Sequence, residues 1–246
     1  MPGEFQGKVV VVTGGSRGIG REIAAEFAGQ GAQTAIVSSS EANLAAAAKT
    51  IAAAGAAPFA IAADLRTLDG CILVNSAGAT RAGNFVDLPD EAWMDGYALK
   101  FFACVRMCRL FWPMLKAAEG HVINISGGGA RSPGADFTIG GSVNAAMGNF
   151  SKGLSQQGKK DGVNVNVIHP GATETERFYQ LIEMRSKASG KPVEQLKQEA
   201  TAKDGLRRLA KAEDIAALAL FLCSEKARHI QGTAIAVDGG ATVGYY

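Results

Sequence analysis

Short β-branched runs alternate with longer Ala-rich segments along almost the whole of this 246-residue chain. The runs 8–13 (KVVVVT) and 34–38 (TAIVS) each precede a segment whose apolar residues have helical spacing. Further strands are predicted at 58–62, 72–75, 121–126, 163–168 and 233–237, and long helices at 18–30, 41–54, 90–117, 140–159 and 211–223. Strands that alternate with helices predict a parallel sheet covered on both faces, which is a doubly wound α/β fold.

Length and composition favour one domain. A chain of 246 residues, 47% of them hydrophobic, can bury one sizeable core. We therefore expect a single domain over residues 1–246. Residues 174–206 are polar and charged, and we expect them to form a small helical lid inserted into this domain.

The composition favours small-molecule partners over nucleic acid or a membrane. The formal net charge is +2, and the most apolar region, 45–63, is interrupted by Lys49 and Thr50. We expect no export signal, no membrane span, no metal site and a cytoplasmic location. The four cysteines have irregular spacing, which fits neither a disulfide framework nor a zinc site, and Cys104 and Cys108 are predicted to share the buried face of a helix.

The connection between the third and fourth predicted strands is too short for this fold. About eight residues separate Asp64 from Ile72, whereas a crossover between parallel strands needs a dozen or more. In a doubly wound sheet these two strands lie on opposite sides of the first strand, and eight extended residues reach at most about 28 Å. We expect a chain break or missing residues between Asp64 and Ile72.

A glycine-rich turn follows the first predicted strand and opens the first helix, with the sequence Thr13-Gly14-Gly15-Ser16-Arg17-Gly18-Ile19-Gly20. Glycines let a backbone turn sharply and approach a pyrophosphate, whose charge is held by free N–H groups and the positive end of the helix dipole. A bare strand-to-helix turn uses the same residues. The position of the turn, after the first strand of an alternating chain, favours a dinucleotide site.

From this motif onward the chain resembles the short-chain dehydrogenase/reductase family over nearly its whole length. The matching pieces are 13–20 (TGGSRGIG), Asp64-Leu65, Asn75-Ser76-Ala77-Gly78, His169-Pro170-Gly171 with Thr175, and Val237-Asp238-Gly239-Gly240. The resemblance implies a seven-stranded Rossmann fold, in which Asp64 and Leu65 contact the adenine of a bound dinucleotide. It further implies that Asn75, Ala77 and Gly78 line the path to the adenine-side ribose, and that Pro170, Gly171 and Thr175 lie along the nicotinamide.

The end of the second predicted strand favours NADP(H), with NAD as the alternative. In Rossmann folds that bind NAD, an acidic residue at this point holds the ribose 2′-hydroxyl and would repel the 2′-phosphate of NADP. Here the sequence is Ser38-Ser39-Ser40, whose hydroxyls can donate to a phosphate, and the guanidinium of Arg17 could pair with it. A solvated loop cation is the alternative interpretation of Arg17.

The residues that carry the family's chemistry are absent. Members of the family hold a carbonyl with Ser and Tyr hydroxyls, while a Lys lowers the Tyr pKa and an Asn helps to hold water. The flanking pattern places these Asn, Ser, Tyr and Lys positions at Lys100, Gly127, Gly140 and Asn144. No Tyr occurs between Tyr97 and Tyr179, so a slip in the alignment does not restore the proton donor.

Other residues can be nominated only loosely as donors. They are Ser126, Ser132, Asp136, Thr138, Ser142 and Tyr179. The Asn and Lys of the family pattern have in effect exchanged positions, because Lys100 stands at the first and Asn144 at the second. We expect Asn144 to point at the nicotinamide ribose. If Lys100 points inward it returns an ammonium to the site, and the alternative is a Lys whose head reaches solvent.

Two functions remain open. The chain is either an NADP(H)-dependent oxidoreductase with an unusual proton donor, or a catalytically silent relative that binds the dinucleotide as a sensor or serves as a structural partner. In both cases we expect a homotetramer, since members of the family associate through the two long helices and the last strand. The apolar residues that could form the helical interface are Phe101, Phe102, Val105, Leu110, Phe111, Met147, Phe150 and Leu154.

Overall fold

A seven-stranded parallel sheet in the order β3-β2-β1-β4-β5-β6-β7 forms the centre of the molecule. The computed structural model describes residues 3–38, 40–61, 71–202 and 205–242. The strands are β1 (Val9–Thr13), β2 (Gln33–Val37), β3 (Phe59–Ile61), β4 (Cys71–Asn75), β5 (His121–Ile125), β6 (Asn164–Pro170) and β7 (Ala234–Val237). Each neighbouring pair is parallel, which confirms the predicted doubly wound α/β fold.

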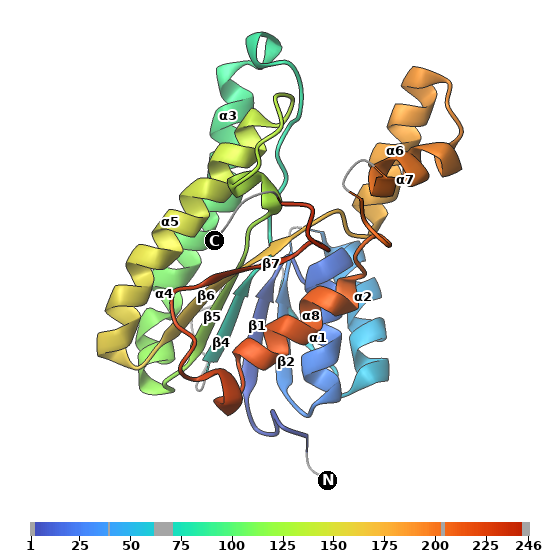
Figure 1. The fold of residues 1–246 in the computed structure, drawn as a ribbon. Helices are drawn as coiled ribbons and strands as arrows, with labels where there is room; N and C mark the ends of the chain where they lie inside the picture. Colours follow the sequence, from blue (N-terminus) through green and yellow to red (C-terminus); the bar gives the residue numbers. More distant parts are fainter. Residues whose placement is uncertain (1–2, 39, 62–70, 203–204, 243–246) are drawn as a thin grey trace.

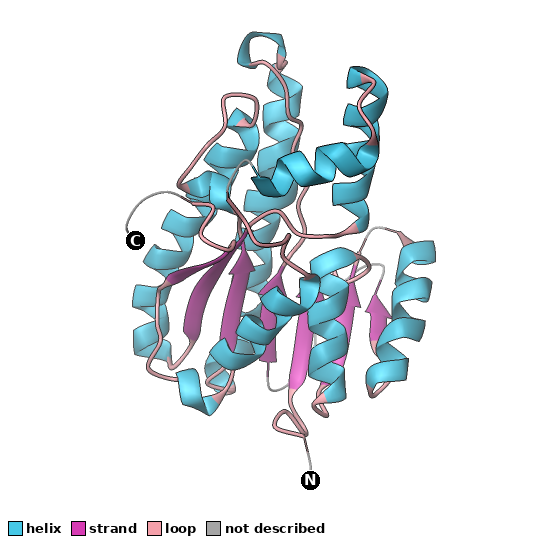
Figure 2. Ribbon diagram, turned by 45° about the vertical axis from the view of Figure 1, so that its right-hand side comes forward, coloured by secondary structure: helices cyan, strands magenta, loops and turns pink. Residues whose placement is uncertain are grey.

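Helices cover both faces of the sheet (Figures 1 and 2). One layer contains α1 (Gly18–Gly29), α2 (Glu41–Ala54) and α8 (Ala212–Leu222), and the other contains α4 (Ala103–Ala117) and α5 (Thr138–Asp161). Short elements complete these layers: α3 (Asp90–Gly96), a π-helical turn η2 (Tyr97–Phe102), and the 3-10 turns η1 (Phe85–Asp87), η3 (Gly128–Ala130) and η4 (Glu225–Ala227). The predicted helix 90–117 is therefore helical throughout, with a wider turn at Tyr97–Phe102.

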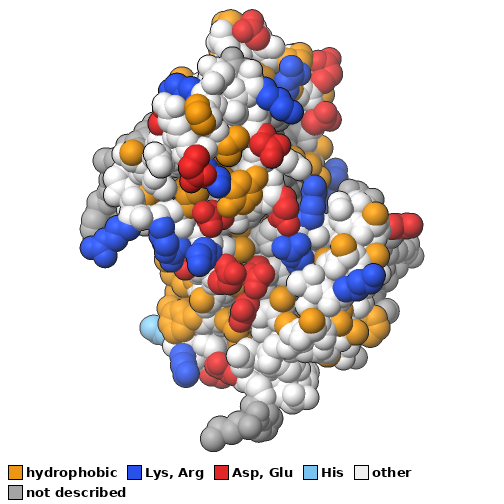
Figure 3. All heavy atoms as spheres, turned by 90° about the vertical axis from the view of Figure 1, so that its right-hand side faces the viewer, with side chains coloured by type: hydrophobic (Ala, Val, Ile, Leu, Met, Phe, Trp, Pro, Cys, Tyr) orange, Lys and Arg blue, Asp and Glu red, His pale blue; other side chains and the backbone are white. Residues whose placement is uncertain are grey.

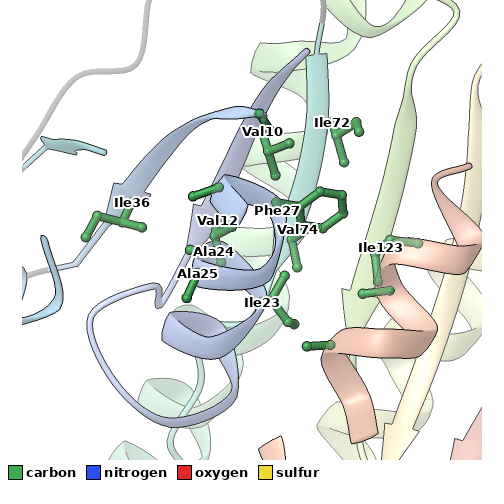
Figure 4. Close-up of a cluster of buried hydrophobic side chains, with 14 of the residues drawn as sticks. Val10, Val12, Ile23, Ala24, Ala25, Phe27, Ile36, Ile72, Val74 and Ile123 are labelled. Atoms are coloured by element: carbon green, nitrogen blue, oxygen red, sulfur yellow. The ribbon is translucent and has the colours of Figure 1, made fainter. Parts of the chain in front are cut away.

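Alternate residues of each strand enter two separate cores, because successive side chains of a strand point to opposite faces. Val10 and Val12 pack with Phe27 of α1 on one face, where Figure 4 shows them beside Val74. Val11 lies between them in sequence and packs on the other face with Phe111 of α4. Cys104 and Cys108 are buried on this second face, which confirms that they share the inner side of their helix.

A pair of helices, α6 (Glu176–Ser189) and α7 (Val193–Ala202), stands within the segment predicted to be a lid. The pair lies beyond the carboxyl ends of the strands, on the side of the sheet edge where the arrowheads point (Figure 2). An isolated parallel bridge between Thr173 and Ala210 joins the two chain segments at its base. The helical pair and the turns that follow the strands thus lie together at the carboxyl end of the sheet.

The link from Asp64 to Ile72 falls largely outside the described residues. β3 and β4 lie on opposite sides of β1 and β2, as the predicted strand order requires. The chain break or missing stretch expected between Asp64 and Ile72 therefore stays a prediction. In the described part of the chain, no helix is long and apolar enough to cross a membrane.

Candidate functional site

Strand register brings the sequence motifs together at the carboxyl edge of the sheet. Thr13 at the end of β1 pairs with Asn75 at the end of β4, and Asn75 pairs with Asn124 of β5. The turns that leave these strands therefore start at the same height. In open α/β sheets this edge, at the point where the strand order reverses, is where ligands bind.

The glycine turn after β1 is shaped by close backbone contacts. Gly14 and Gly18 have φ of 73° and 51°, a region that favours glycine. A Cβ on Gly14 would lie 2.9 Å from the backbone nitrogen of Ala77, and one on Gly18 would lie 3.3 Å from Cγ2 of Thr175. The glycine loop thus lies directly against the turn after β4 and the segment after β6.

The N-terminus of α1 opens toward this loop. Arg17 is the residue before the helix, and its side chain makes no capping hydrogen bond. A Cβ on Gly20 would clash with the carbonyl oxygen of Gly14, so the helix packs closely on the turn, while Ile19 is half-buried. Backbone N–H groups of an uncapped first turn are available to an anion.

Hydroxyl groups meet at the end of β2. The Ser16 hydroxyl donates a hydrogen bond to Oγ of Ser38 over 2.8 Å, and the Ser40 side chain caps α2. Arg17 is exposed beside them. Ser39, Asp64 and Leu65 lie outside the described residues, so their expected cofactor contacts stay predictions.

The Asn75 side chain is buried and points toward Asn124 of β5. Its side-chain nitrogen donates to Oδ1 of Asn124 over 2.8 Å, and the Asn124 amide donates to Ser151 of α5 over 2.7 Å. Asn75 is therefore a link in a buried polar chain, while Ala77 is half-buried and Gly78 is exposed. The expected contacts of these three residues with a dinucleotide stay predictions. The sequence analysis did not identify Asn124 or Ser151, although both are polar residues within apolar stretches.

The segment after β6 is fixed against the last strand and the glycine loop. A Cβ on Gly171 would lie 2.7 Å from Cβ of Asp238, so this turn also needs a small residue. Pro170 is the last residue of β6. The Thr175 hydroxyl accepts a hydrogen bond from the Phe178 backbone and caps α6, and this cap places Thr175 beside Gly18.

Gly127 and Gly140 stand at the expected Ser and Tyr positions, and neighbouring side chains fill the space beside them. A Cβ on Gly127 would lie 2.8 Å from Nδ2 of Asn144, and a Cβ on Gly140 would overlap the ring of Phe137. The Phe137 ring therefore takes the space where a side chain at Gly140 would begin. Asn144 is buried on α5, and its Oδ1 has no hydrogen-bond partner among the described residues.

Lys100 points into the site from the π-helical turn. Its ammonium donates a hydrogen bond to the carbonyl oxygen of Ser126 over 3.0 Å. A Cβ on Gly78 would lie 2.7 Å from Cδ of Lys100, so the Lys stem packs on the turn after β4. Burial, and then the charge of Arg177, lowers the pKa of Lys100 to about 8. The inward orientation is readable from spacing, because Lys100 precedes buried Cys104 and Cys108 at four-residue intervals.

The other nominated donors differ in exposure and in hydrogen bonding. The Ser126 hydroxyl donates to the backbone oxygen of Asn144, and the Ser142 hydroxyl donates to the backbone oxygen of Ile139, both over 3.0 Å. Ser132 and Asp136 are exposed, Thr138 begins α5 with a buried hydroxyl that has no described partner, and Tyr179 contacts Lys197 of α7.

His169 also lies at the site. Its Nδ1 accepts a hydrogen bond from the Gly127 backbone over 3.3 Å, and the side chain is buried. Burial, followed by the charge of Arg131, lowers the pKa of His169. The imidazole is therefore neutral at neutral pH. Sequence analysis placed His169 only within a motif, and no spacing signal identified its contact with Gly127.

The helical pair α6–α7 is held at the rim of the site. Arg21 of α1 forms an ion pair with Glu176 over 3.3 Å, and Arg177 donates to the carbonyl oxygen of Thr80 over 3.5 Å. A cavity of about 460 Å³ lies between α1, the start of α6 and the start of α8, and its lining includes Gly18, Arg21, Thr175, Tyr179 and Lys211. Figure 3 shows acidic and basic side chains interspersed on the face toward α2, α6 and α7. No cluster of metal-ligating side chains occurs among the described residues.

The parallel sheet, with its glycine turn at the carboxyl edge, defines a Rossmann-type α/β protein. The family model described as short chain dehydrogenase matches residues 8–186. The chain therefore belongs to the short-chain dehydrogenase/reductase family.

Similar proteins cover almost the full chain. The 3-oxoacyl-[acyl-carrier-protein] reductase FabG of Chlamydia trachomatis is 32% identical, over 98% of this chain and 99% of that protein. The 2,3-dihydro-2,3-dihydroxybenzoate dehydrogenase of Bacillus subtilis is 30% identical, with 98% of each chain covered. The crystal structure of L-sorbose reductase from Gluconobacter frateurii, complexed with NADPH and L-sorbose, has 30% identity, 100% coverage of both chains and a TM-score of 0.92.

Proposed function

We propose that this protein is an NADP(H)-dependent oxidoreductase that interconverts a carbonyl and an alcohol without the Ser, Tyr and Lys residues of its family. The observation that carries this proposal is the position of the glycine loop, which lies against the turn after β4. The Lys100 stem packs on the same turn, and its ammonium donates to the Ser126 carbonyl. A dinucleotide groove and a charged group thus share one edge of the sheet.

The residues around the groove fit a dinucleotide. Gly14, Gly18 and Gly20 leave no room for side chains, so backbone amides of the loop and of α1 can approach a pyrophosphate. The Ser16 and Ser38 hydroxyls and the exposed Arg17 suit a 2′-phosphate. NADPH in the L-sorbose reductase complex supports the same choice of cofactor. When bound in its reduced form, the dinucleotide supplies a hydride to a carbonyl carbon.

Asn144 takes the cofactor-holding role of the family's Lys in this proposal. Its buried Oδ1 lacks a partner in the described structure and can accept a hydrogen bond from a ribose hydroxyl. An amide carries no charge, so it does not lower the pKa of a neighbouring donor. The proton donor must therefore be non-standard, because neither Gly127 nor Gly140 has a side chain that could give a proton.

The helical pair α6–α7 serves as a lid in this proposal, within a single domain over 1–246. The ion pair of Glu176 with α1, the contact of Arg177 with Thr80 and the cavity between α6 and α1 support this role. The full-length relatives that carry reductase names support an enzyme with a small-molecule substrate. Cytoplasmic location and assembly as a homotetramer are part of the same proposal.

Titration with NADPH, followed by a screen of carbonyl substrates, tests this function. We expect binding with a shift of NADPH fluorescence, tighter than for NADH, and turnover of at least one sugar ketone, 3-oxo thioester or simple ketone. Binding without any turnover would instead support a catalytically silent protein that acts as a dinucleotide sensor or structural partner. Absence of NADPH binding would contradict both.

A further inference from the structure

Lys100 presents a cation at the site without a carboxylate partner. No ion pair between described residues involves Lys100, and its ammonium donates a hydrogen bond to the Ser126 carbonyl. A Lys ammonium has three N–H donors. Two donors therefore remain after the bond to Ser126, in a place where burial makes an unpaired charge costly.

The charged groups around Lys100 favour release of its proton. Burial and then the charge of Arg177 lower the pKa of Lys100, and Cys104 on the same helix face has a smaller, opposite effect. His169 is neutral and Asp238 is engaged by the backbone of Gly240 and Thr242. A Lys in this setting exchanges protons near neutral pH, as general acid–base catalysis requires.

Competing donors are weaker on structural grounds. The hydroxyl protons of Ser126 and Ser142 are used in bonds to helix carbonyls. Thr138 has an unpartnered hydroxyl, but an alcohol without a neighbouring base holds its proton too tightly. His169 accepts the Gly127 N–H at Nδ1, and burial lowers its pKa, so the neutral imidazole is favoured, and its remaining N–H is a weak acid.

We propose that Lys100 is the residue that exchanges the proton with the substrate oxygen. This inference rests on the proposed oxidoreductase function and deepens it. In the reducing direction the carbonyl carbon accepts a hydride, while the oxygen takes a proton from the Lys100 ammonium. One N–H bond breaks, one O–H bond forms, and the neutral amine regains its proton from water. In the oxidising direction the amine accepts the alcohol proton.

Three variants test the role of Lys100. Lys100→Gln removes the acid, Lys100→Arg keeps the charge but does not release a proton, and Lys152→Gln is a matched control. Lys152 also donates to a backbone oxygen, that of Gly232, but it is exposed. We expect Lys100→Gln and Lys100→Arg to reduce carbonyl turnover about 100-fold or more, with NADPH affinity within about threefold of wild type for a group that does not hold the cofactor. Lys152→Gln should change neither.

The pH dependence separates proton transfer from positioning. The ammonium is the donor, so wild-type reduction should fall as pH rises through about 8, and the Lys100 variants should lose this limb. A purely electrostatic role would be rescued by Lys100→Arg, which would overturn the inference. Unchanged turnover and pH profile in Lys100→Gln would also overturn it, while the proposed function would stand.

Competitive acylation of cofactor-free protein gives a readout that does not depend on activity. Amines react only when deprotonated, so the labelling of Lys100 with acetic anhydride, followed by mass spectrometry, should have a midpoint near pH 8. A midpoint near 10.5, the ordinary value for Lys, would overturn the inference. Wild-type protein that binds NADPH but reduces no carbonyl would contradict the proposed function, which is a different outcome.

Discussion

Phe137 fills the space beside Gly140 that a catalytic aromatic residue would enter. Because a Cβ on Gly140 would overlap the Phe137 ring, restoring Tyr at this position requires Phe137 to move. Asn144 restricts Gly127 in the same way, with its Nδ2 at 2.8 Å from a Cβ there. The two glycines therefore belong to a repacked site, in which neighbouring side chains occupy the space of the lost groups.

A double-mutant cycle measures this packing. Gly140→Ala should lower the free energy of unfolding by about 1–3 kcal/mol, because it overpacks against Phe137. In a Phe137→Ala background the same substitution should cost much less, since the ring is gone. Gly148→Ala is the control, because a Cβ there meets nothing within 4 Å, and it should stabilise α5 by about 1 kcal/mol. Equal costs of Gly140→Ala in both backgrounds, from urea unfolding, would contradict the packing.

The elements show which sequence signals determine the fold. Strand predictions at 72–75 and 121–126 agree with β4 and β5 to within one residue, because buried apolar runs between turns are a strong local signal. The π-helical turn at Tyr97–Phe102 was not predicted, since helix periodicity does not reveal one wider turn. That turn carries Lys100, and π-helical turns occur frequently at functional sites.

The sequence predicts some features of the candidate site and not others. The glycine loop and its contacts with the turn after β4 were predictable from motif order. The direction of Asn75 depends on packing against Asn124, a distant segment that spacing along the chain does not reveal. The Phe137 ring at Gly140 is a local contact between residues three apart, but the sequence does not show which way the ring turns at the start of α5. The inward direction of Lys100 was open in the sequence analysis, although its four-residue spacing to Cys104 contained the signal.

At the scale of the whole molecule, exposed apolar side chains concentrate along one stretch of chain. Among the described residues, six of the eight exposed large apolar side chains lie between residues 85 and 110, namely Phe85, Val86, Met94, Leu99, Phe102 and Leu110, and the other two are Phe59 and Phe221. Two members of the predicted interface, Phe111 and Met147, are instead buried in the protomer's own core. An exposed apolar stripe of this kind favours self-association through the α3–α4 side.

Charge on this stripe should break the assembly. We expect light scattering to give a tetramer for the wild type and a smaller species for Leu110→Glu, because a carboxylate is costly in an apolar interface. Phe221→Glu is the control, since Phe221 has a similar exposure, 43% against 45% for Leu110, but lies on α8. A monodisperse wild-type monomer would contradict the predicted assembly.

The central claim is that one groove holds a dinucleotide whose reactive end meets Lys100. A crystal structure of the protein with NADP⁺ tests it most directly. We predict the pyrophosphate on the Gly14–Gly20 turn, the nicotinamide ribose beside Asn144, and the Lys100 ammonium facing the space next to the nicotinamide. A complex in which the nicotinamide lies outside this edge of the sheet, or in which Lys100 turns to solvent, would contradict the account.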